Sequence, residues 1–306
     1  MIMNQLAIII PAYKIDFFER TLQSLADQTC KDFTVYVGDD CSPADFKGLI
    51  EKYQNQLDIH YTKFETNMGG KDLVAQWERC VDLSQGEPWL WLFSDDDELE
   101  PICVECFYKT INNTDAQSNV YHFSTFVIDD KSDIVRKSPE YPQSLYGYDY
   151  YKKKMLVKID SFVVENIFRR SVYRRNNGFA KFDMAWGADT ASWVIFAGDQ
   201  PIQTIHGACV RWRQSDLNIT PNTSKDVLIR KLNALLNFLQ WSFDQFKNKR
   251  SIKLFNFIFT IKRFHYYAKG LEVSQVSSIS KNYLMNNFGS FGYKSIIFLT
   301  RLLRIW

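Results

Sequence analysis

Three consecutive aspartates, Asp95, Asp96 and Asp97, directly follow the apolar run 89–93. An apolar run bounded by polar residues predicts a buried strand, and open α/β sheets bind ligands at the carboxyl ends of their strands. Carboxylates this close repel one another unless a cation or water relieves them. Mg²⁺ or Mn²⁺ is commonly held by one or two carboxylates and completed by phosphate oxygens. The triplet therefore indicates either a metal site or a solvated acidic turn ahead of a helix that begins near Pro101.

The strands expected in the first 112 residues all end in polar or turn-forming residues. Apolar runs predict strands at 6–10, 33–37, 59–64 and 89–93. Helices fit the segments between and after them at 17–28, 44–54, 71–83 and 101–112. This alternation predicts a doubly wound, mostly parallel α/β sheet with its binding edge at the strand carboxyl ends. The first three ends carry Pro11, Ala12 and Tyr13, then Asp39 and Asp40, then Asn67, Met68, Gly69 and Gly70. Four such clusters on one edge favour a site for nucleotide, phosphate and metal.

Motifs of the common competing enzyme classes are missing from the sequence. No G-x-G-x-x-G follows the first strand, which disfavours a dinucleotide oxidoreductase. Gly70 and Lys71 have Glu65 where the first glycine of a P-loop belongs, so a P-loop ATPase does not fit. No G-x-S-x-G turn supports a hydrolase.

Several motifs in register resemble the family-two glycosyltransferases of the A-type fold. They are the runs 8–13, 37–42, 67–69 and 93–97, whose order and spacing agree with that family. Three later segments look like its acceptor-side part, which closes with a catalytic acidic residue: 167–170, 178–179 and 186–189. The resemblance covers about residues 5 to 220. It implies the nucleotide-diphospho-sugar transferase sheet and transfer of a sugar from a nucleotide donor.

The resemblance implies a nucleotide site along the strand ends. Asp39 would accept a hydrogen bond from the N3–H of uracil. The residues that would border the nucleobase are Pro11, Ala12 and Tyr13. The residues that lie where the family contacts nucleotide or phosphate are Asn67, Gly69 and Lys71.

The resemblance also implies roles for the triplet. Asp95 would lie near the ribose or the donor sugar, and Asp96 is the first choice for direct contact with Mn²⁺ or Mg²⁺, with Asp97 next. The repeated aspartates leave that register ambiguous. Cys41 departs from the family pattern, because it replaces the usual glycine after the Asp-Asp pair, and this leaves the base specificity less certain.

Asp189 is the acidic residue in the segment that resembles the family's catalytic motif. Ala188 replaces the acidic residue that commonly precedes the base, so Asp189 is the remaining candidate there. A single carboxylate that takes the acceptor's proton, opposite the leaving group, predicts direct displacement with inversion at the anomeric carbon. Aspartate is also favoured as the N-cap of a helix, which the residues after it predict. The two roles are compatible.

Two arginines alternate in the strand-like stretch 208–215. Arg211 and Arg213 are two residues apart and therefore point to the same face of a strand. A guanidinium fork suits phosphate oxygens, so we expect Arg213 to clamp the diphosphate. An ion pair with the acidic body of the protein is the alternative.

The charge of the chain is divided unevenly. Residues 1–220 carry 23 Lys/Arg and 32 Asp/Glu, whereas residues 221–306 carry 14 and 3. We expect a catalytic domain at 1–220, with a nucleotide-binding half at 1–112 and an acceptor half at 113–220. Residues 221–306 would form a basic, aromatic, helical region, with a leucine stripe at its start. Such a region suits an anionic membrane surface, or packs its aromatic residues on the catalytic body.

These features predict an inverting, metal-dependent glycosyltransferase that uses a UDP-sugar. The resemblance places its hydroxyl acceptor, a saccharide or lipid-linked saccharide, in surface polysaccharide or glycolipid synthesis. No run reaches the length of a membrane span and none fits a signal peptide, so we expect a cytoplasmic protein, with peripheral attachment to the inner membrane face as an option. Nucleic acid is not an expected partner, because no recognition motif is visible. The alternatives are a sugar nucleotidyltransferase and a catalytically silent carbohydrate-binding protein of the same fold.

Overall fold

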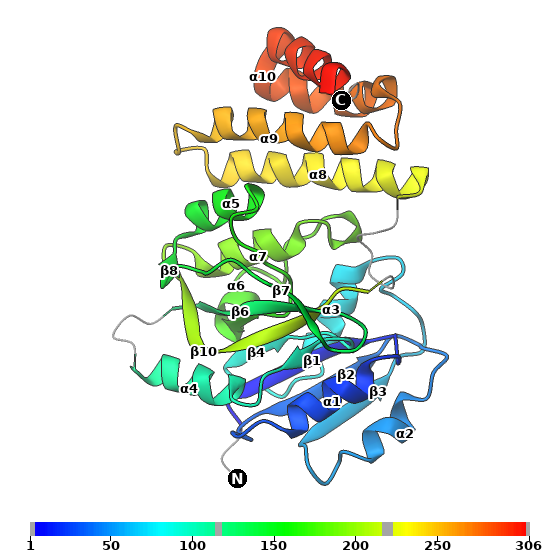
Figure 1. Ribbon diagram of the computed structural model, residues 1–306, viewed down its shortest axis with the longest axis vertical. Coiled ribbons are helices and arrows are strands. Elements are labelled where there is room, and N and C mark those ends of the chain that lie inside the picture. The colour runs from blue at the N-terminus through cyan, green and yellow to red at the C-terminus, as the bar shows by residue number, and fades with distance from the viewer. Residues whose placement is uncertain (1–3, 114–117, 216–222, 304–306) are drawn as a thin grey trace. The chain divides into compact units, whose positions relative to one another are not determined.

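The computed structural model describes residues 4–113, 118–215 and 223–303, and the chain forms two compact units (Figure 1). One unit, here called the sheet unit, comprises Met1–Ala180 and Asp189–Asp216. The other, here called the helical unit, comprises Lys181–Ala188 and Leu217–Trp306. The domain boundary predicted at residue 220 lies outside the described residues.

The sheet unit is built on one ten-stranded sheet of the described residues, in the order β3-β2-β1-β4-β9-β6-β10-β5, with β7 beside β6 and β8 beside β10. The strands are β1 (Leu6–Ala12), β2 (Thr34–Asp39), β3 (Ile59–Lys63), β4 (Trp89–Leu92), β5 (Glu98–Leu99), β6 (Val120–Ile128), β7 (Ile134–Lys137), β8 (Ser144–Leu145), β9 (Asn166–Arg169) and β10 (Ile202–Arg213). The first four run parallel, as the sequence predicts, so their carboxyl ends share one edge.

The second half of the sheet is mixed. β9 runs antiparallel to both β4 and β6, while β10 runs parallel to β6. Because β9 joins the two halves in one sheet, the triplet after β4 and the arginines at the end of β10 belong to the same framework. The strand-like stretch predicted at 208–215 belongs to β10, which ends at Arg213.

Helices cover both faces of the sheet. The helices of this unit are α1 (Phe18–Ala26), α2 (Phe46–Glu51), α3 (Leu73–Val81), α4 (Cys103–Asn113), α5 (Gly147–Met155), α6 (Arg170–Arg175) and α7 (Ala188–Ala197). The short 3-10 helix η1 (Asp183–Ala185) precedes α7 in the sequence and belongs to the helical unit. Alternation along β1 sends Ile8 and Ile10 to the face covered by α1, where they join the core with Phe18 and Leu22. The first four predicted helices are confirmed, each within a few residues.

The helical unit contains α8 (Lys225–Gln245), α9 (Ile252–Tyr267) and α10 (Val273–Leu303), the last kinked at Gly289. The leucine stripe predicted along α8 is buried and consists of Leu228, Leu232, Leu235, Leu236 and Leu239. None of the described helices combines the length and the apolar character that a membrane span requires.

Candidate active site

The loops after β1 and β4 are fastened together at the shared edge of the sheet. The carboxylate oxygen Oδ2 of Asp95 accepts hydrogen bonds from the backbone N–H groups of Tyr13 and Lys14, both at 2.7 Å. The parallel pairing of β1 with β4 makes this contact possible across 82 positions of sequence. Asp95 therefore sets the shape of the loop that carries Tyr13, in addition to the sugar-side contact expected from the resemblance.

The triplet is buried at the carboxyl end of β4, which removes the alternative of a solvated turn. Asp95, Asp96 and Asp97 are 5%, 5% and 1% exposed. Burial and the neighbouring charge of Asp96 raise the pKa of Asp95 to about 6 and raise the pKa of Asp97 well above its usual range. Three carboxylates in a dry site keep their charge more easily when a cation is present.

Lys14 already supplies one cation to this site. Its ammonium Nζ lies 3.0 Å from Oδ2 of Asp96. Burial acts against the charged lysine, yet Asp96, Asp95 and Asp97 outweigh it and raise the pKa of Lys14. The sequence reasoning missed this residue, although it directly follows the predicted base-binding run 11–13.

The residues present fit Mg²⁺ or Mn²⁺. Among the described residues no three His, Cys, Asp or Glu side chains form a ready-made metal cage. Such ions need no cage when a diphosphate supplies most of the oxygens. Asp97 accepts from the backbone N–H of Arg213 at 2.6 Å and Asp95 is bonded to the β1 loop, whereas Asp96 is bonded to the side chains of Lys14 and Ser94. The partners of Asp96 are side chains, which can change rotamer, so Asp96 is the carboxylate that can exchange them for a metal ion.

Arg213 is not placed as a phosphate clamp. Its side chain is 0% exposed, and Nε donates to the carbonyl oxygen of Asp96 at 2.8 Å. Its terminal nitrogens donate to the carbonyl oxygen of Asp129, to the Glu98 carboxylate and to Ser132 Oγ. The expected contact with the diphosphate is therefore corrected. All the described bonds of the guanidinium are with the protein, which agrees with the ion-pair alternative. Arg213 links the end of β10 to the aspartate triplet.

Asp39 is held at the end of β2 by the loop that follows it and by side chains of β3. It is 0% exposed, its Oδ1 accepts from Ser42 N at 2.7 Å, and its Oδ2 accepts from the Tyr61 hydroxyl at 2.6 Å. Lys63 Nζ lies 3.8 Å from the same carboxylate. This arrangement orients Asp39 within the predicted base pocket, and the bond to uracil stays a prediction.

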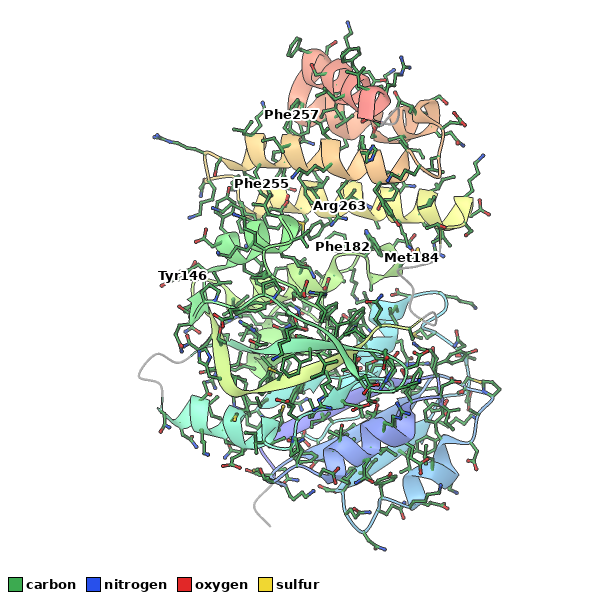
Figure 2. All side chains as sticks on the ribbon, in the orientation of Figure 1. Tyr146, Phe182, Met184, Phe255, Phe257 and Arg263 are labelled. Atoms are coloured by element: carbon green, nitrogen blue, oxygen red, sulfur yellow. The ribbon has the colours of Figure 1, made fainter. Side chains whose placement is uncertain are left out.

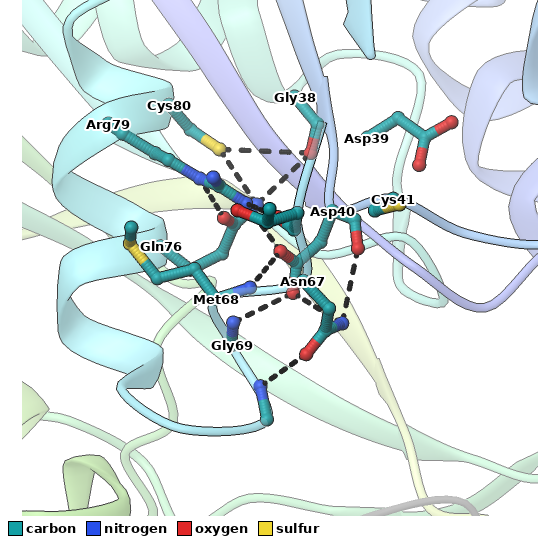
Figure 3. Close-up of polar contacts among 12 residues, drawn as sticks. Gly38, Asp39, Asp40, Cys41, Asn67, Met68, Gly69, Gln76, Arg79 and Cys80 are labelled. Carbon is teal, nitrogen blue, oxygen red and sulfur yellow. Dashed lines mark hydrogen bonds and ion pairs between the residues drawn. The ribbon is translucent and has the colours of Figure 1, made fainter. Parts of the chain in front are cut away.

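Asp40 organises the loop after β3, a role the sequence reasoning did not assign (Figure 3). Its carboxylate accepts from the backbone N–H groups of Met68 at 2.6 Å and Gly69 at 2.8 Å, and from the Asn67 side chain at 3.0 Å. The guanidinium of Arg79 pairs with it. The signal available in the sequence was the Asp-Asp pair itself, because alternation at a strand end sends neighbouring side chains in different directions.

Gly69 has a steric reason to be glycine. A Cβ there would lie 2.8 Å from Oδ2 of Asp40, closer than a carbon and an oxygen can approach. Asn67 and Gly69, expected to contact nucleotide or phosphate, are thus parts of the Asp40 network. Lys71 is exposed and lies two residues ahead of α3.

The three residues predicted to border the nucleobase differ in solvent exposure. Ala12 is 1% exposed, Pro11 is partly buried, and Tyr13 is 47% exposed. An exposed aromatic ring that follows a fixed backbone is suited to stack on a nucleobase.

Cys41 has a left-handed backbone, with φ of 57°. The family pattern has glycine at this position, and glycine adopts this conformation without steric cost. The replacement of glycine by Cys41 therefore affects the backbone conformation as well as the expected base specificity.

Asp189 lies in the first turn of α7, one residue after the helix begins, and not at the N-cap. It is partly buried, and desolvation raises its pKa, opposed by the positive charge of Lys154 and by bonds from Thr190. A carboxylate with a raised pKa is a better proton acceptor near neutral pH. Asp189 is hydrogen-bonded by Thr190 and interacts electrostatically with Lys154 and Tyr150, and no described contact joins it to the triplet.

Comparison with known proteins agrees with this geometry. The profile of Glycosyl transferase family 2 matches residues 7–176. A poly(ribitol-phosphate) beta-N-acetylglucosaminyltransferase, TarS of Staphylococcus aureus, is 35% identical over 99 residues. That match spans 31% of this chain and 17% of the relative, so it covers about a sixth of the relative's length.

Solved structures show the same fold at low sequence identity. S. aureus TarS 1-349 in complex with UDP-GlcNAc superposes with a TM-score of 0.60 at 16% identity, over 98% of this chain and 90% of that one. A mannosyltransferase from Pyrobaculum calidifontis, in complex with GDP-Man and Mn²⁺, gives 0.51 at 12% identity, over 99% and 87%. The family match covers more than half of the chain, and the chain therefore belongs to glycosyl transferase family 2, as a glycosyltransferase of the A-type fold.

Proposed function

We propose that this glycosyltransferase moves a sugar from a UDP-sugar to a hydroxyl acceptor, with Mg²⁺ or Mn²⁺ and with inversion at the anomeric carbon. The observation that carries the proposal is the buried triplet, whose Asp96 carboxylate lies 3.0 Å from the Lys14 ammonium at the shared edge of β1 and β4. This is an anionic site prepared for positive charge next to the predicted nucleotide pocket. The family match argues against a sugar nucleotidyltransferase or a silent binding protein.

The proposed reaction assigns a role to each of four aspartates. When bound, the metal neutralises the charge that develops on the leaving diphosphate. Asp96 would hold it, with Asp97 next, while Asp95 keeps the β1 loop in place. Asp189 would take the proton from the acceptor hydroxyl as that oxygen attacks, and one base on the side away from the leaving group gives inversion.

The donor and acceptor proposals follow the relatives. TarS was crystallised with UDP-GlcNAc, so UDP-GlcNAc is the first donor to test. The acceptor would be a surface polysaccharide or a lipid-linked saccharide. Poly(ribitol-phosphate), the polymer in the name of the S. aureus relative, is the first acceptor to test. Tyr146, 59% exposed on the sheet unit, offers an aromatic face for such a chain (Figure 2).

We also propose that the chain associates peripherally with an anionic membrane on the cytoplasmic side. Phe291, Phe298 and Leu302 are 85%, 60% and 42% exposed, and their spacing of seven and four puts them on one side of α10. Lys294 and Arg301 flank this face, here called the α10 face. Residues 251–303 carry seven Lys/Arg and one Asp/Glu, which suits an anionic surface. Arg304 and Trp306, expected in the same contact, lie outside the described residues.

A screen of nucleotide sugars tests the proposed reaction. Purified protein is incubated with UDP-GlcNAc, other UDP-sugars and GDP-Man, each with Mn²⁺, Mg²⁺ or EDTA, and free nucleotide is measured. We expect release from a UDP-sugar that needs metal and is lost in Asp96→Ala. The exposed Asp16→Ala is the matched control. Release that persists in EDTA would disprove metal dependence, and release from GDP-Man alone would disprove the donor class.

A further inference from the structure

The six residues that precede α7, Phe182 to Gly187, form a turn that contains two residues with a strained backbone. Met184 and Ala185 have φ of 57° and 54°, both in the left-handed region, and Gly187 has φ of 95°. Two adjacent non-glycine residues in this region persist when their surroundings over-determine them. We call residues 182–187 the pre-base turn, because the base candidate Asp189 lies two residues beyond it.

Side chains of α8 bind the first half of the pre-base turn through an ion pair and a ring contact. Arg230 donates from Nε and Nη2 to the two carboxylate oxygens of Asp183, at 2.9 and 2.6 Å. This two-pronged pair fixes direction as well as distance. The rings of Phe182 and Phe238 meet edge to face at 5.7 Å. Figure 2 shows Phe182 and Met184 beside α8, within the same unit of the chain.

The second half of the pre-base turn also packs against α8 and α9. The ammonium of Lys231, a residue that is 0% exposed, lies 4.9 Å from the centre of the Trp186 ring. Trp186 also hydrogen-bonds the Tyr267 side chain of α9. A Cβ on Gly187 would lie 2.8 Å from the Phe238 ring, so the turn passes α8 at the distance that only a glycine allows.

The pre-base turn is continuous with the helix that carries the base. α7 begins at Ala188, immediately after Gly187, and Asp189 is its second residue. On the other side of the turn, the backbone N–H of Ala180 donates to Ser192 Oγ of α7 at 2.9 Å. A shift of Gly187 therefore moves the first turn of α7 directly, because no flexible residue lies between them.

We propose that Arg230, Lys231 and Phe238 are positioning residues for catalysis, which act by fixing the pre-base turn and through it Asp189. They belong to the helical unit and touch no proposed substrate atom. The inference rests on the proposed role of Asp189 as the base. It gives the helical unit a part in the reaction that is separate from any membrane contact.

The Asp183–Arg230 pair allows positioning to be separated from stability. Its side chains are 41% and 45% exposed, and exposed ion pairs contribute little to the stability of a fold. A misplaced catalytic group, in contrast, is costly to turnover even when the displacement is about 1 Å. Loss of this pair should therefore lower kcat and leave folding and donor binding in place.

The test compares three variants of the full chain: Arg230→Ala, the exchange Asp183→Arg with Arg230→Asp, and Lys225→Ala as the matched control on an exposed cation of α8. We expect Arg230→Ala to lower kcat by about 10- to 100-fold with the donor KM within about twofold. The exchanged pair should restore most of the loss, and Lys225→Ala should match wild type. A kcat within twofold of wild type in Arg230→Ala would overturn the proposal.

Hydrogen exchange supplies a readout that needs no turnover. Amides of residues 182–192 should exchange faster in Arg230→Ala than in wild type, while α9 keeps its rate and the melting temperature is unchanged. If wild type transfers no sugar, the proposed function fails, and the exchange measurement still decides whether α8 fixes the turn. Equal exchange in the two proteins would overturn the positioning role.

Discussion

The Lys14 ammonium lies 3.0 Å from the Asp96 carboxylate, across 82 positions of sequence. The two residues come from loops after adjacent parallel strands, so their approach is a consequence of the pairing of β1 with β4. An ammonium at this place has the same charge sign as the metal ion proposed for Asp96. The two cations are therefore expected to compete for one carboxylate.

Removal of Lys14 should strengthen metal binding. Lys14→Ala leaves the triplet more negative, so the Mn²⁺ concentration that half-saturates the protein in the presence of UDP should fall by about fivefold, roughly the effect of one nearby charge in a partly solvated site. Calorimetric titration with Mn²⁺ measures it. Lys47→Ala, which removes an exposed lysine from α2, is the control. Weaker Mn²⁺ binding in Lys14→Ala would show that the lysine supports the metal site and does not compete with it.

Asp189→Asn should separate binding from chemistry. The amide keeps the size of the carboxylate but cannot accept the acceptor's proton, so turnover should fall by roughly 10²-fold while donor affinity persists. In wild type, kcat should rise with pH through the pKa of Asp189, which desolvation raises from its ordinary value. Turnover of the variant within a few-fold of wild type would place the base elsewhere.

Glu165 should make the fold less stable as pH rises from acid conditions to neutrality. It is 0% exposed, and burial raises its pKa to about 7. The folded state then holds a proton that the unfolded state has lost, so this contribution is present below the unfolded pKa of about 4.3 and disappears as pH rises to about 7. The difference between these two pKa values, about 2.7, corresponds to about 4 kcal/mol in the free energy of unfolding. Urea titrations at pH 5 and 8 should show the loss in wild type and little of it in Glu165→Gln, and equal losses in both would refute it.

Cys41→Gly should stabilise the protein. A non-glycine residue in the left-handed region costs about 1 kcal/mol, which glycine does not incur. The substitution removes a weak bond from the thiol to the Glu65 carbonyl at 3.4 Å, a smaller loss. Denaturant unfolding measures the difference. A lower unfolding midpoint in Cys41→Gly would show that the thiol contact outweighs the backbone strain.

The α10 face should bind anionic vesicles reversibly. Each basic residue near such a surface contributes about 1 kcal/mol at most, so salt should release the protein. Co-sedimentation should fall in Phe291→Ser with Phe298→Ser, and in Lys294→Glu with Arg301→Glu. Val157→Ser, at an exposed apolar residue of the sheet unit, is the control. Equal recovery of wild type from anionic and neutral vesicles would exclude the membrane contact.

The first four strands and helices could be predicted from the sequence because their signals are local. Apolar runs such as 6–10 and 89–93 specify buried strands, and the turn residues after them mark the edge of the sheet. The placement of the aspartate triplet at that edge needed nothing beyond the run ahead of it. Membership of the family followed from motifs in register.

Tertiary structure decided which partner each of these side chains meets. Arg213 reaches the carbonyl of Asp96 across 117 positions, Asp183 pairs with Arg230 across 47, and β9 reverses direction between β4 and β6. The amino-acid types allowed Arg213 to hold either a phosphate or the protein, and the chain gave no local signal for either. Such pairings depend on how strands far apart in sequence are ordered in the sheet and on which helix a turn packs against. Local propensity carries no information about that order, because the contacts that set it form between segments that the sequence separates.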